Sequence, residues 1–502
     1  MLSIYRSITP KNIRICPVLN RLQSQSLSST CPANANVNSS TTKAHHPLLT
    51  HVPSLPFVGS TIPSYSGIPQ MGAGNDFDFW VKVRKKFGEF YTIGMPGFGN
   101  GLHGTTHVVT DPKEMAKVIR SEGKYPSGIV QQQWVLKKVM KEASHPLTSG
   151  EQDGFFGRGT DWKRHRTFLQ TDLLSPQAAA GYLPGVIHAA ELASRGAPAS
   201  NNDLNTYLNH CAFDMFCTVM FGILSETADP NTPTDPENLE FCNAAKVQLA
   251  TNNIMNRDPT EIVLGKIFGI QTDRYATITQ AFNTTERIGS RKIKQFIAKK
   301  KEGSLSEFEG KSWLSHAIDR QHQTDNNVTE EEMRKLAGVA LSAAVDTTSG
   351  LLSWNLLQIA VHPRVQEKLY DEISNAVAQT GGKLTPEILQ NRSRTPYLHA
   401  VIRETHRLTP TAPINVAKKV ASDIEIHGQT FPEGTFFVFD SYSSGRDPNL
   451  VDDPDIFCPE RWLPDAIAAR KGTPKSIIDN QFYREPFSQG YVSSNIKISN
   501  MC

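Results

Sequence analysis

The sequence predicts a mainly helical protein with a smaller β-rich lobe. Three observations support this fold class: long segments of helical character dominate, strand signals are few, and no internal repeat is evident. The helical segments include residues 211–221, 276–301 and 330–361, and the strand signals lie at residues 89–93, 106–109, 424–427 and 435–439. A chain of 502 residues has room for two or three average domains. One large domain fits better, because the motifs described below span the chain.

Charge and cysteine usage exclude several classes of function. The formal net charge of +3 is too small to indicate a nucleic-acid-binding protein, and no basic tract with interleaved aromatic residues occurs. The seven cysteines include no CxxC pair and no zinc-ligand spacing. They indicate free thiols or a reducing compartment.

The N-terminal region has the composition of a mitochondrial transit peptide. The first acidic residue is Asp76, and several basic residues precede it amid Ser, Thr and Asn: Arg6, Lys11, Arg14 and Arg21. We predict a transit peptide, or alternatively a disordered segment, over residues 1–46, with a plastid as the less favoured destination. A Pro-rich linker is expected over residues 47–75 and the main domain over residues 76–490. No run of about 18 apolar residues follows the transit segment, so no N-terminal membrane anchor is expected.

Residues 330–361 are predicted to form one long apolar helix. Thr329 and Glu332 make a capping-box signature at its start, and Pro363 marks its end. Roughly 30 residues at a rise of 1.5 Å would span about 45 Å, which is enough to cross a whole domain.

Two pairs of side chains in predicted helices are candidates for a functional role. Asp346 and Thr347 lie at the centre of the long helix, where buried polar groups are costly unless they have partners. Trp162 and Arg166 are four residues apart and therefore share one face of a helix. The alternative interpretations are a solvent-facing polar stretch for the first pair and an ordinary basic amphipathic helix for the second.

A shorter helix, predicted over residues 397–408, carries a charge pair at the edge of its apolar face. Glu404 and Arg407 are three residues apart and share that face. A buried pair with unsatisfied groups is costly, so further donors are needed. Arg461 is a candidate, because its planar guanidinium group fits a carboxylate.

In their order and approximate separation, Glu404, Arg407 and Arg461 resemble the charge triad of the cytochrome P-450 superfamily, the haem-thiolate monooxygenases. The intervening sequence is similar too, at residues 431–435, 445–448 and 457–462. The resemblance implies the cytochrome P-450 fold. It also implies that the triad is structural and holds the segment under the haem.

The same resemblance assigns roles to the two candidate pairs. Asp346 and Thr347 match the oxygen-activation motif of the family, whose side chains deliver protons to the oxygen. Trp162 and Arg166 match the pair that binds a haem propionate through a charge-assisted contact. Lys418 falls where the family commonly places another propionate-binding cation.

The haem-ligand loop of the family is matched only in part. Its pattern, Phe-x-x-Gly-x-Arg-x-Cys-x-Gly, fits Phe487 and Gly490, but Val492 stands at the Arg position and Ser494 at the Cys position. In the family the Cys thiolate binds iron, and a serine hydroxyl is a poor substitute for it. We therefore expect no metal ligand in the chain and interpret residues 491–502 as an aberrant tail, from translated intron or a mistaken gene model. The polypeptide as written is then more consistent with inactivity than with activity.

The function implied by the resemblance is that of a haem-dependent monooxygenase in the mitochondrion. It would oxidise a lipophilic small molecule, such as a sterol or a fatty acid, with O2 and electrons from a ferredoxin-type donor docking near Arg403 or Lys419. Peripheral membrane association is compatible with this role. Two alternatives stay open: a truncated, non-enzymatic product that binds lipophilic ligands, and a haem-thiolate isomerase or lyase that needs no external electrons. Residues 125–159 and 201–303, the variable segments of the family, contain nothing that fixes the substrate.

Overall fold

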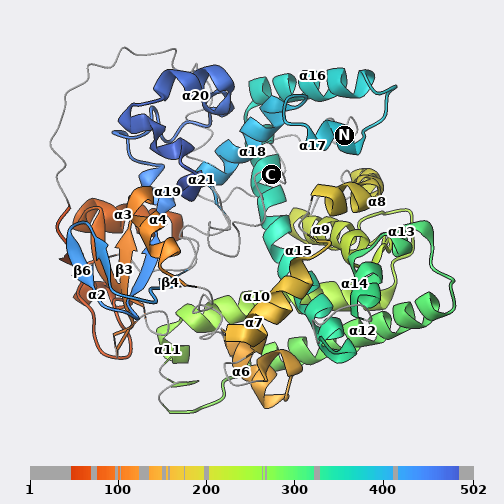
Figure 1. Cartoon of the computed structure of the whole chain (residues 1–502), viewed down its shortest axis with the longest axis horizontal. Helices are drawn as coiled ribbons and strands as arrows, with labels where there is room; N and C mark the ends of the chain where they lie inside the picture. Colours follow the sequence, from red (N-terminus) through yellow and green to blue (C-terminus); the bar gives the residue numbers. More distant parts are fainter. Residues whose placement is uncertain are drawn as a thin grey trace.

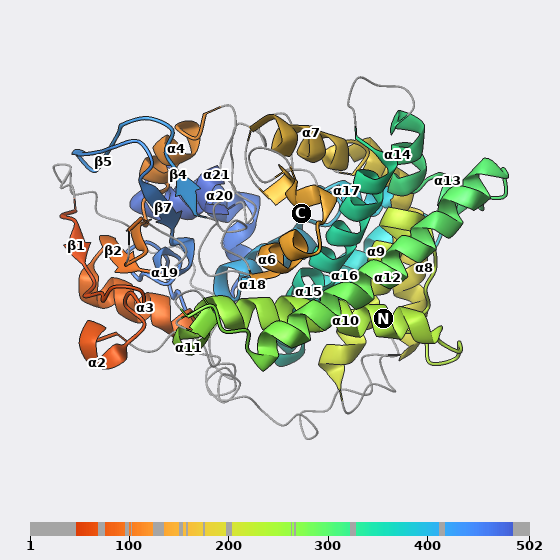
Figure 2. The same ribbon diagram turned by 90° about the horizontal axis from the view of Figure 1, so that it is seen from below.

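The described residues form a helical body beside a smaller β-rich lobe (Figure 1), which confirms the predicted fold class. The computed structural model describes residues 47–68, 76–95, 100–101, 103–123, 135–149, 154–156, 159–173, 176–196, 203–262, 264–265, 268–321, 328–410 and 417–484. Seen from below, the lobe again lies to one side of the body (Figure 2).

The β-rich lobe contains a five-stranded sheet of order β1-β2-β3-β7-β4. Its strands are β1 (Thr50–His51), β2 (Phe90–Gly94), β3 (Thr105–Val109), β7 (Phe436–Phe439) and β4 (Lys418–Lys419). Strands β2 and β3 are antiparallel with Phe90 opposite Val109, whereas β3 and β7 are parallel with Val109 opposite Phe439. Early and late segments of the chain, orange and blue in Figure 1, therefore share one sheet.

A separate hairpin joins β5 (Ile424–Ile426) to β6 (Gln429–Phe431). Its two connecting residues, His427 and Gly428, both have positive φ angles, of 49° and 74°. Positive φ at both central positions is what a two-residue type I′ turn requires.

Helices make up the rest of the described structure. The longer ones are α3 (Asp76–Phe87), α4 (Pro112–Arg120), α6 (Val135–Glu142), α7 (Gly159–Gln170), α8 (Pro176–Gly196), α9 (Leu204–Phe221), α10 (Pro236–Arg257), α12 (Asp273–Lys301), α14 (Trp313–Gln321), α15 (Glu330–Val361), α16 (Pro363–Ala378) and α18 (Pro396–Leu408). The shorter ones are α2 (Pro63–Ser66), α11 (Pro259–Ile262), α13 (Glu307–Gly310), α17 (Pro386–Gln390), α19 (Ser441–Ser444), α20 (Pro464–Arg470) and α21 (Gln481–Arg484). Four 3₁₀ turns are described: η3 (Pro146–Thr148), η4 (Gly154–Phe156), η7 (Pro459–Trp462) and η8 (Pro474–Asp479).

Helix α15 is the central element of the body. It begins with the predicted capping box: the Thr329 backbone N–H donates to Glu332 at 2.8 Å, and the Glu332 backbone N–H donates to the Thr329 hydroxyl at 3.1 Å. Pro363, which opens α16, follows its end. The helix packs against α9, α10, α12, α14, α16 and α18. Its buried apolar residues, such as Leu336 and Val345, belong to the largest apolar cluster of the molecule.

Within the described residues, α15 is also the one helix long and apolar enough to cross a membrane. That test uses length and composition alone. Core helices of globular proteins pass it too, and α15 packs against six other helices of the described chain.

Residues 47–68 differ from the Pro-rich linker that we expected over residues 47–75. The segment Thr50–His51 pairs with β2, and Val52 and Ile68 are buried against the sheet and α3. Burial of such apolar side chains stabilises a folded conformation of the segment, which its proline content did not indicate. The predicted transit peptide and the predicted tail lie outside the described residues.

Candidate functional site

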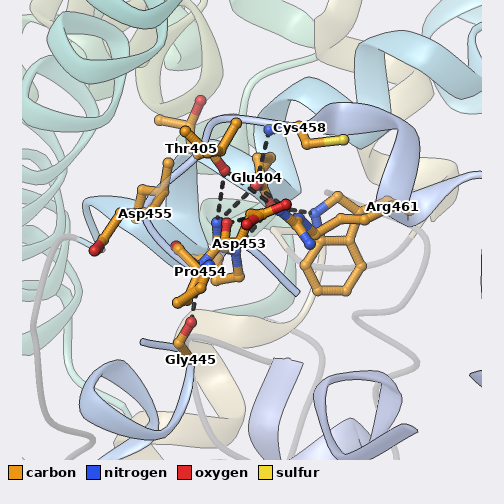
Figure 3. A network of polar contacts seen from close by, with 12 residues as sticks. Glu404, Thr405, Gly445, Asp453, Pro454, Asp455, Cys458 and Arg461 are labelled. Atoms are coloured by element: carbon orange, nitrogen blue, oxygen red, sulfur yellow. Dashed lines mark hydrogen bonds and ion pairs between the residues drawn. The ribbon is translucent and has the colours of Figure 1, made fainter. Parts of the chain in front are cut away.

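The structure brings together the three charged side chains of the predicted triad, and Figure 3 shows Glu404 beside Arg461. Glu404 lies on α18, and its carboxylate is fully buried. Arg407, one turn later, donates to it from Nε at 2.9 Å and from Nη2 at 2.7 Å. Arg461, on η7, donates from Nε at 2.9 Å. The three-residue spacing predicted the contact between Glu404 and Arg407. The fold brings Arg461 from η7 to the same carboxylate.

Two further donors complete the shell around the Glu404 carboxylate. The Cys458 backbone N–H donates at 3.0 Å, and the Trp462 indole N–H donates at 2.8 Å. Burial alone would raise the pKa of Glu404, but the charges of Arg407 and Arg461 together with these hydrogen bonds lower it to about 2. The carboxylate is therefore ionised at neutral pH and has a partner for each of its oxygens.

The remaining guanidinium N–H groups of the triad bind backbone carbonyls. Arg407 donates to the carbonyl oxygens of Gly445 at 2.8 Å, Pro454 at 2.6 Å and Ile456 at 3.2 Å. Arg461 donates to the carbonyl oxygen of Asp452 at 3.1 Å. The network thus ties α18 to the irregular segment that runs from residue 445 to residue 462. Such an arrangement holds a loop in place and leaves no carboxylate oxygen available for proton transfer.

Asp346 and Thr347 lie at the middle of α15, as predicted. The Thr347 side chain is exposed, and its hydroxyl donates back to the Ala343 carbonyl at 3.1 Å within the helix. Asp346 is half-buried, and burial raises the pKa of its carboxyl group, although the charge of Lys246 on α10 opposes that shift. An accessible hydroxyl beside a carboxyl group of raised pKa is a pair able to hold and pass protons.

Trp162 and Arg166 lie on α7, as predicted, and both are half-buried. The Nε atom of Arg166 is buried and has no hydrogen-bond partner in the described part of the chain. Burial lowers the pKa of this guanidinium group. A buried cation without a counter-charge is costly. Arg166 therefore fits an anionic ligand, such as the propionate of a haem.

Lys418 is in a different situation from Arg166. It lies on β4, and its ammonium group is 2.9 Å from the carboxylate of Glu122, with which it forms an ion pair. Burial raises the pKa of Glu122, and the charge of Lys418 opposes the shift. A second anion near Lys418 would have to compete with this carboxylate.

The predicted haem-ligand loop cannot be placed in the same way. Phe487, Gly490 and Ser494 lie outside the described residues. Among the residues that the structure does describe, no group of three or more His, Cys, Asp or Glu side chains is arranged to hold a metal ion. Among the described residues, the side chain whose surroundings fit haem binding is therefore Arg166, which would bind a haem propionate.

The comparison with protein families gives a match that covers most of the chain. A model of the family described as Cytochrome P450 matches residues 53–491. The chain belongs to the cytochrome P450 family. The predicted family is thereby confirmed, and with it the expectation of an oxidoreductase family that uses haem.

Proteins named as mitochondrial enzymes are among the similar proteins. A mitochondrial sterol 26-hydroxylase from Oryctolagus cuniculus is 27% identical over 385 residues, which cover 74% of this chain and 67% of that protein. A mitochondrial cholesterol side-chain cleavage enzyme from Bos taurus is 26% identical over 371 residues, which cover 71% of this chain and 65% of that protein. Cytochrome P450 10 from Lymnaea stagnalis is 25% identical over 424 residues, 80% of this chain and 71% of that protein. The alignments thus span about two thirds of the first two relatives.

Two sets of contacts were missed by the sequence reasoning. Trp462 donates to Glu404, and its position directly after Arg461 was the available signal. The second role of Glu332 was also missed: besides capping α15, it binds Arg164 and His165 of α7. No pattern in the sequence connects α7 with the start of α15, because the two segments are far apart along the chain.

Proposed function

We propose that this cytochrome P450 is a haem-dependent monooxygenase that oxidises a sterol-class lipophilic molecule in the mitochondrion. The names of its relatives support the substrate class and the location. The observation that supports haem binding most directly is Arg166, a half-buried residue whose buried Nε atom has no hydrogen-bond partner in the described part of the chain. The reaction consumes O2 and electrons from a ferredoxin-type donor.

Each candidate residue has a defined part in this proposal. When bound, haem supplies the redox chemistry that activates O2. Arg166 and Trp162 hold a propionate, and Lys418 assists there only where its ion pair with Glu122 is released. Asp346 and Thr347 hold protons on their carboxyl and hydroxyl oxygens beside the reaction site. Glu404, Arg407 and Arg461 fix the segment that carries the lower face of the site.

Ser494 limits this proposal for the polypeptide as written. A serine hydroxyl does not replace the Cys thiolate that binds iron in the family. We therefore propose that this sequence gives no thiolate-ligated haem. A catalytically inactive chain that still binds lipophilic molecules is the second candidate function, and Ser494 is the observation that favours it.

The reduced carbon-monoxide spectrum of the purified protein tests both proposals. The unchanged chain is expected to lack the Soret band of thiolate-ligated haem. A variant with Val492→Arg, Ser494→Cys and Ile496→Gly, which restores the family pattern, is expected to gain it. The thiolate band in the unchanged chain would disprove the role given to Ser494. Failure of both proteins to take up any haem would disprove the haem proposal itself.

Sterol binding is tested separately, by equilibrium titration of the purified chain with radiolabelled cholesterol and with a fatty acid as competitor. We expect cholesterol to bind more tightly than the fatty acid. Equal binding of the two would overturn the assignment to the sterol class while leaving haem binding untouched.

The site of electron entry is proposed to lie near Arg403, on α18, or near Lys419, on β4. Reduction by a ferredoxin-type donor is expected to slow when either charge is reversed, because complementary charges accelerate the encounter. Reduction rates that stay unchanged for both Arg403→Glu and Lys419→Glu would place the donor elsewhere.

A further inference from the structure

Helix α7 is bound to α15 through the carboxylate of Glu332. Glu332, in the first turn of α15, accepts from both terminal nitrogens of Arg164, at 3.0 Å and 2.7 Å. His165 Nε2 lies 2.9 Å from the same carboxylate. Hydrogen bonds from His165 and Arg164 hold the pKa of Glu332 well below its usual range, although burial alone would raise it. The carboxylate thus remains charged and bound to α7 at all ordinary pH values.

Arg166, the predicted propionate ligand, lies on the face of α7 opposite to Arg164. At about 100° per residue, positions 164 and 166 point roughly 160° apart, while Trp162 and Arg166 share a face. The Arg166 guanidinium group makes no ion pair within the described part of the chain, and its buried Nε atom has no hydrogen-bond partner there. Burial lowers the pKa of this group. Left to itself, a helix with such a cation would rotate to bring it into water. Some contact must therefore hold α7 in its present orientation.

Glu332 is a charged contact that opposes this rotation at the middle of α7. Other contacts hold the C-terminal end of α7: Trp313 Nε1 donates to the Leu169 carbonyl at 3.0 Å, and Arg320, which donates to the Phe168 carbonyl at 3.1 Å, also forms an ion pair with Asp172 just after the helix. Those bonds fix the position of that end. The paired hydrogen bonds from Arg164 to Glu332 have a fixed planar geometry, and they lie beside Arg166 in the chain. Together with the packing of the buried Phe168 ring against Trp313, they restrict the rotation of the helix about its own axis.

We propose that Glu332 is a positioning residue for Arg166: by binding Arg164 and His165 it orients α7 so that Arg166 faces an anionic ligand. The identity of that ligand as a haem propionate rests on the proposed function above. Glu332 contributes no group to the ligand itself. Glu332 belongs to the first turn of α15, the helix that carries Thr347. Its contacts therefore set the orientation of α7 relative to α15.

Hydrogen exchange on the haem-free protein tests the orienting role directly. Glu332→Gln removes the charge but keeps an N3 side chain able to cap α15, because Glu and Gln both serve in a capping box. Glu331→Gln is the matched control, since this exposed neighbour lies in the same turn and loses the same charge. We expect amides of α7 to exchange about tenfold faster in Glu332→Gln and within about twofold of the unchanged protein in Glu331→Gln. Unchanged exchange of α7 in Glu332→Gln would overturn the proposal.

A second variant guards against a folding defect. Arg164→Met removes the other half of the pair and leaves the contact between Thr329 and Glu332 intact. It is expected to accelerate exchange of α7 as Glu332→Gln does. Normal exchange in Arg164→Met would likewise overturn the proposal.

The rate of haem transfer to an apoprotein acceptor then shows whether Glu332 acts through Arg166. We expect Glu332→Gln to accelerate haem loss about tenfold in the otherwise unchanged chain and to have no further effect in an Arg166→Leu background. The same acceleration in both backgrounds would mean that Glu332 stabilises the protein generally, and would overturn its positioning role. Failure of both the unchanged chain and the variant with Val492→Arg, Ser494→Cys and Ile496→Gly to take up haem would refute the proposed function, and hydrogen exchange would still decide whether Glu332 orients α7.

Discussion

Replacement of Glu404 by Gln tests whether the buried charge network carries the stability of the C-terminal part of the domain. Glu404 accepts five hydrogen bonds, three of them from Arg407 and Arg461. Gln offers one acceptor oxygen and places an NH2 group against donors. Breaking a buried ion pair on one side costs about 3–5 kcal/mol. The lowering of the pKa of Glu404 to about 2 by Arg407 and Arg461 has the same sign, because it means that the folded protein favours the charged carboxylate. We therefore expect a loss of about 3–5 kcal/mol in the free energy of unfolding.

Urea unfolding, followed by circular dichroism and by the fluorescence of Trp residues such as Trp462, measures this loss. Glu367→Gln is the control, because Glu367 is exposed on α16 and its replacement is expected to change stability by less than about 0.5 kcal/mol. A loss below about 1 kcal/mol in Glu404→Gln would refute the reasoning, since a neutral side chain would then satisfy the same donors.

The pH dependence of the same comparison gives a second check. The folded-state pKa of Glu404 is depressed, so the carboxylate contributes its full stability above pH 4.5 and loses it as the pH falls toward about 2. The unchanged protein is therefore expected to lose stability more steeply than Glu404→Gln between pH 4.5 and the lowest pH at which both still fold. Parallel curves over that range would contradict the assigned pKa shift.

Three further predictions concern single positions. Arg166→Met is expected to stabilise the haem-free protein by about 1 kcal/mol, because it removes a half-buried cation whose buried Nε atom has no partner in the described residues; a lower unfolding midpoint would count against this. Gly445→Ala is expected to cost about 1–3 kcal/mol, because a Cβ atom there would lie 2.3 Å from the Tyr483 hydroxyl; an unchanged midpoint would show that Tyr483 moves freely. Thr347→Val is expected to change stability by less than about 0.5 kcal/mol, because the exposed hydroxyl bonds only within its own helix, and a larger loss in thermal unfolding would reveal a structural role.

The elements that the sequence predicted best are those with local signals. The bounds predicted for α15 agree with the structure, because the capping box at Thr329 and the proline at position 363 act on adjacent residues. The contact between Glu404 and Arg407 follows from helix spacing in the same way.

Features that depend on distant segments were predicted less well. The stretch around Val52 was expected to be a linker because of its prolines, and its pairing with β2 involves a strand that lies much later in the sequence. The ion pair of Lys418 with Glu122 was not predicted for the same reason, since the two residues lie far apart in the sequence. In both cases the partner is determined by tertiary packing, which composition and spacing do not encode.

The parallel pairing of β3 with β7 bears on how the protein is made. Synthesis proceeds at about 5–20 residues per second, so His107 leaves the ribosome roughly tens of seconds before its partner Phe437. During that interval the edge of β3 presents unpaired backbone groups, which are prone to join with other chains. The free edge of β3 is therefore open to pairing with other chains until β7 has been synthesised and can cover it.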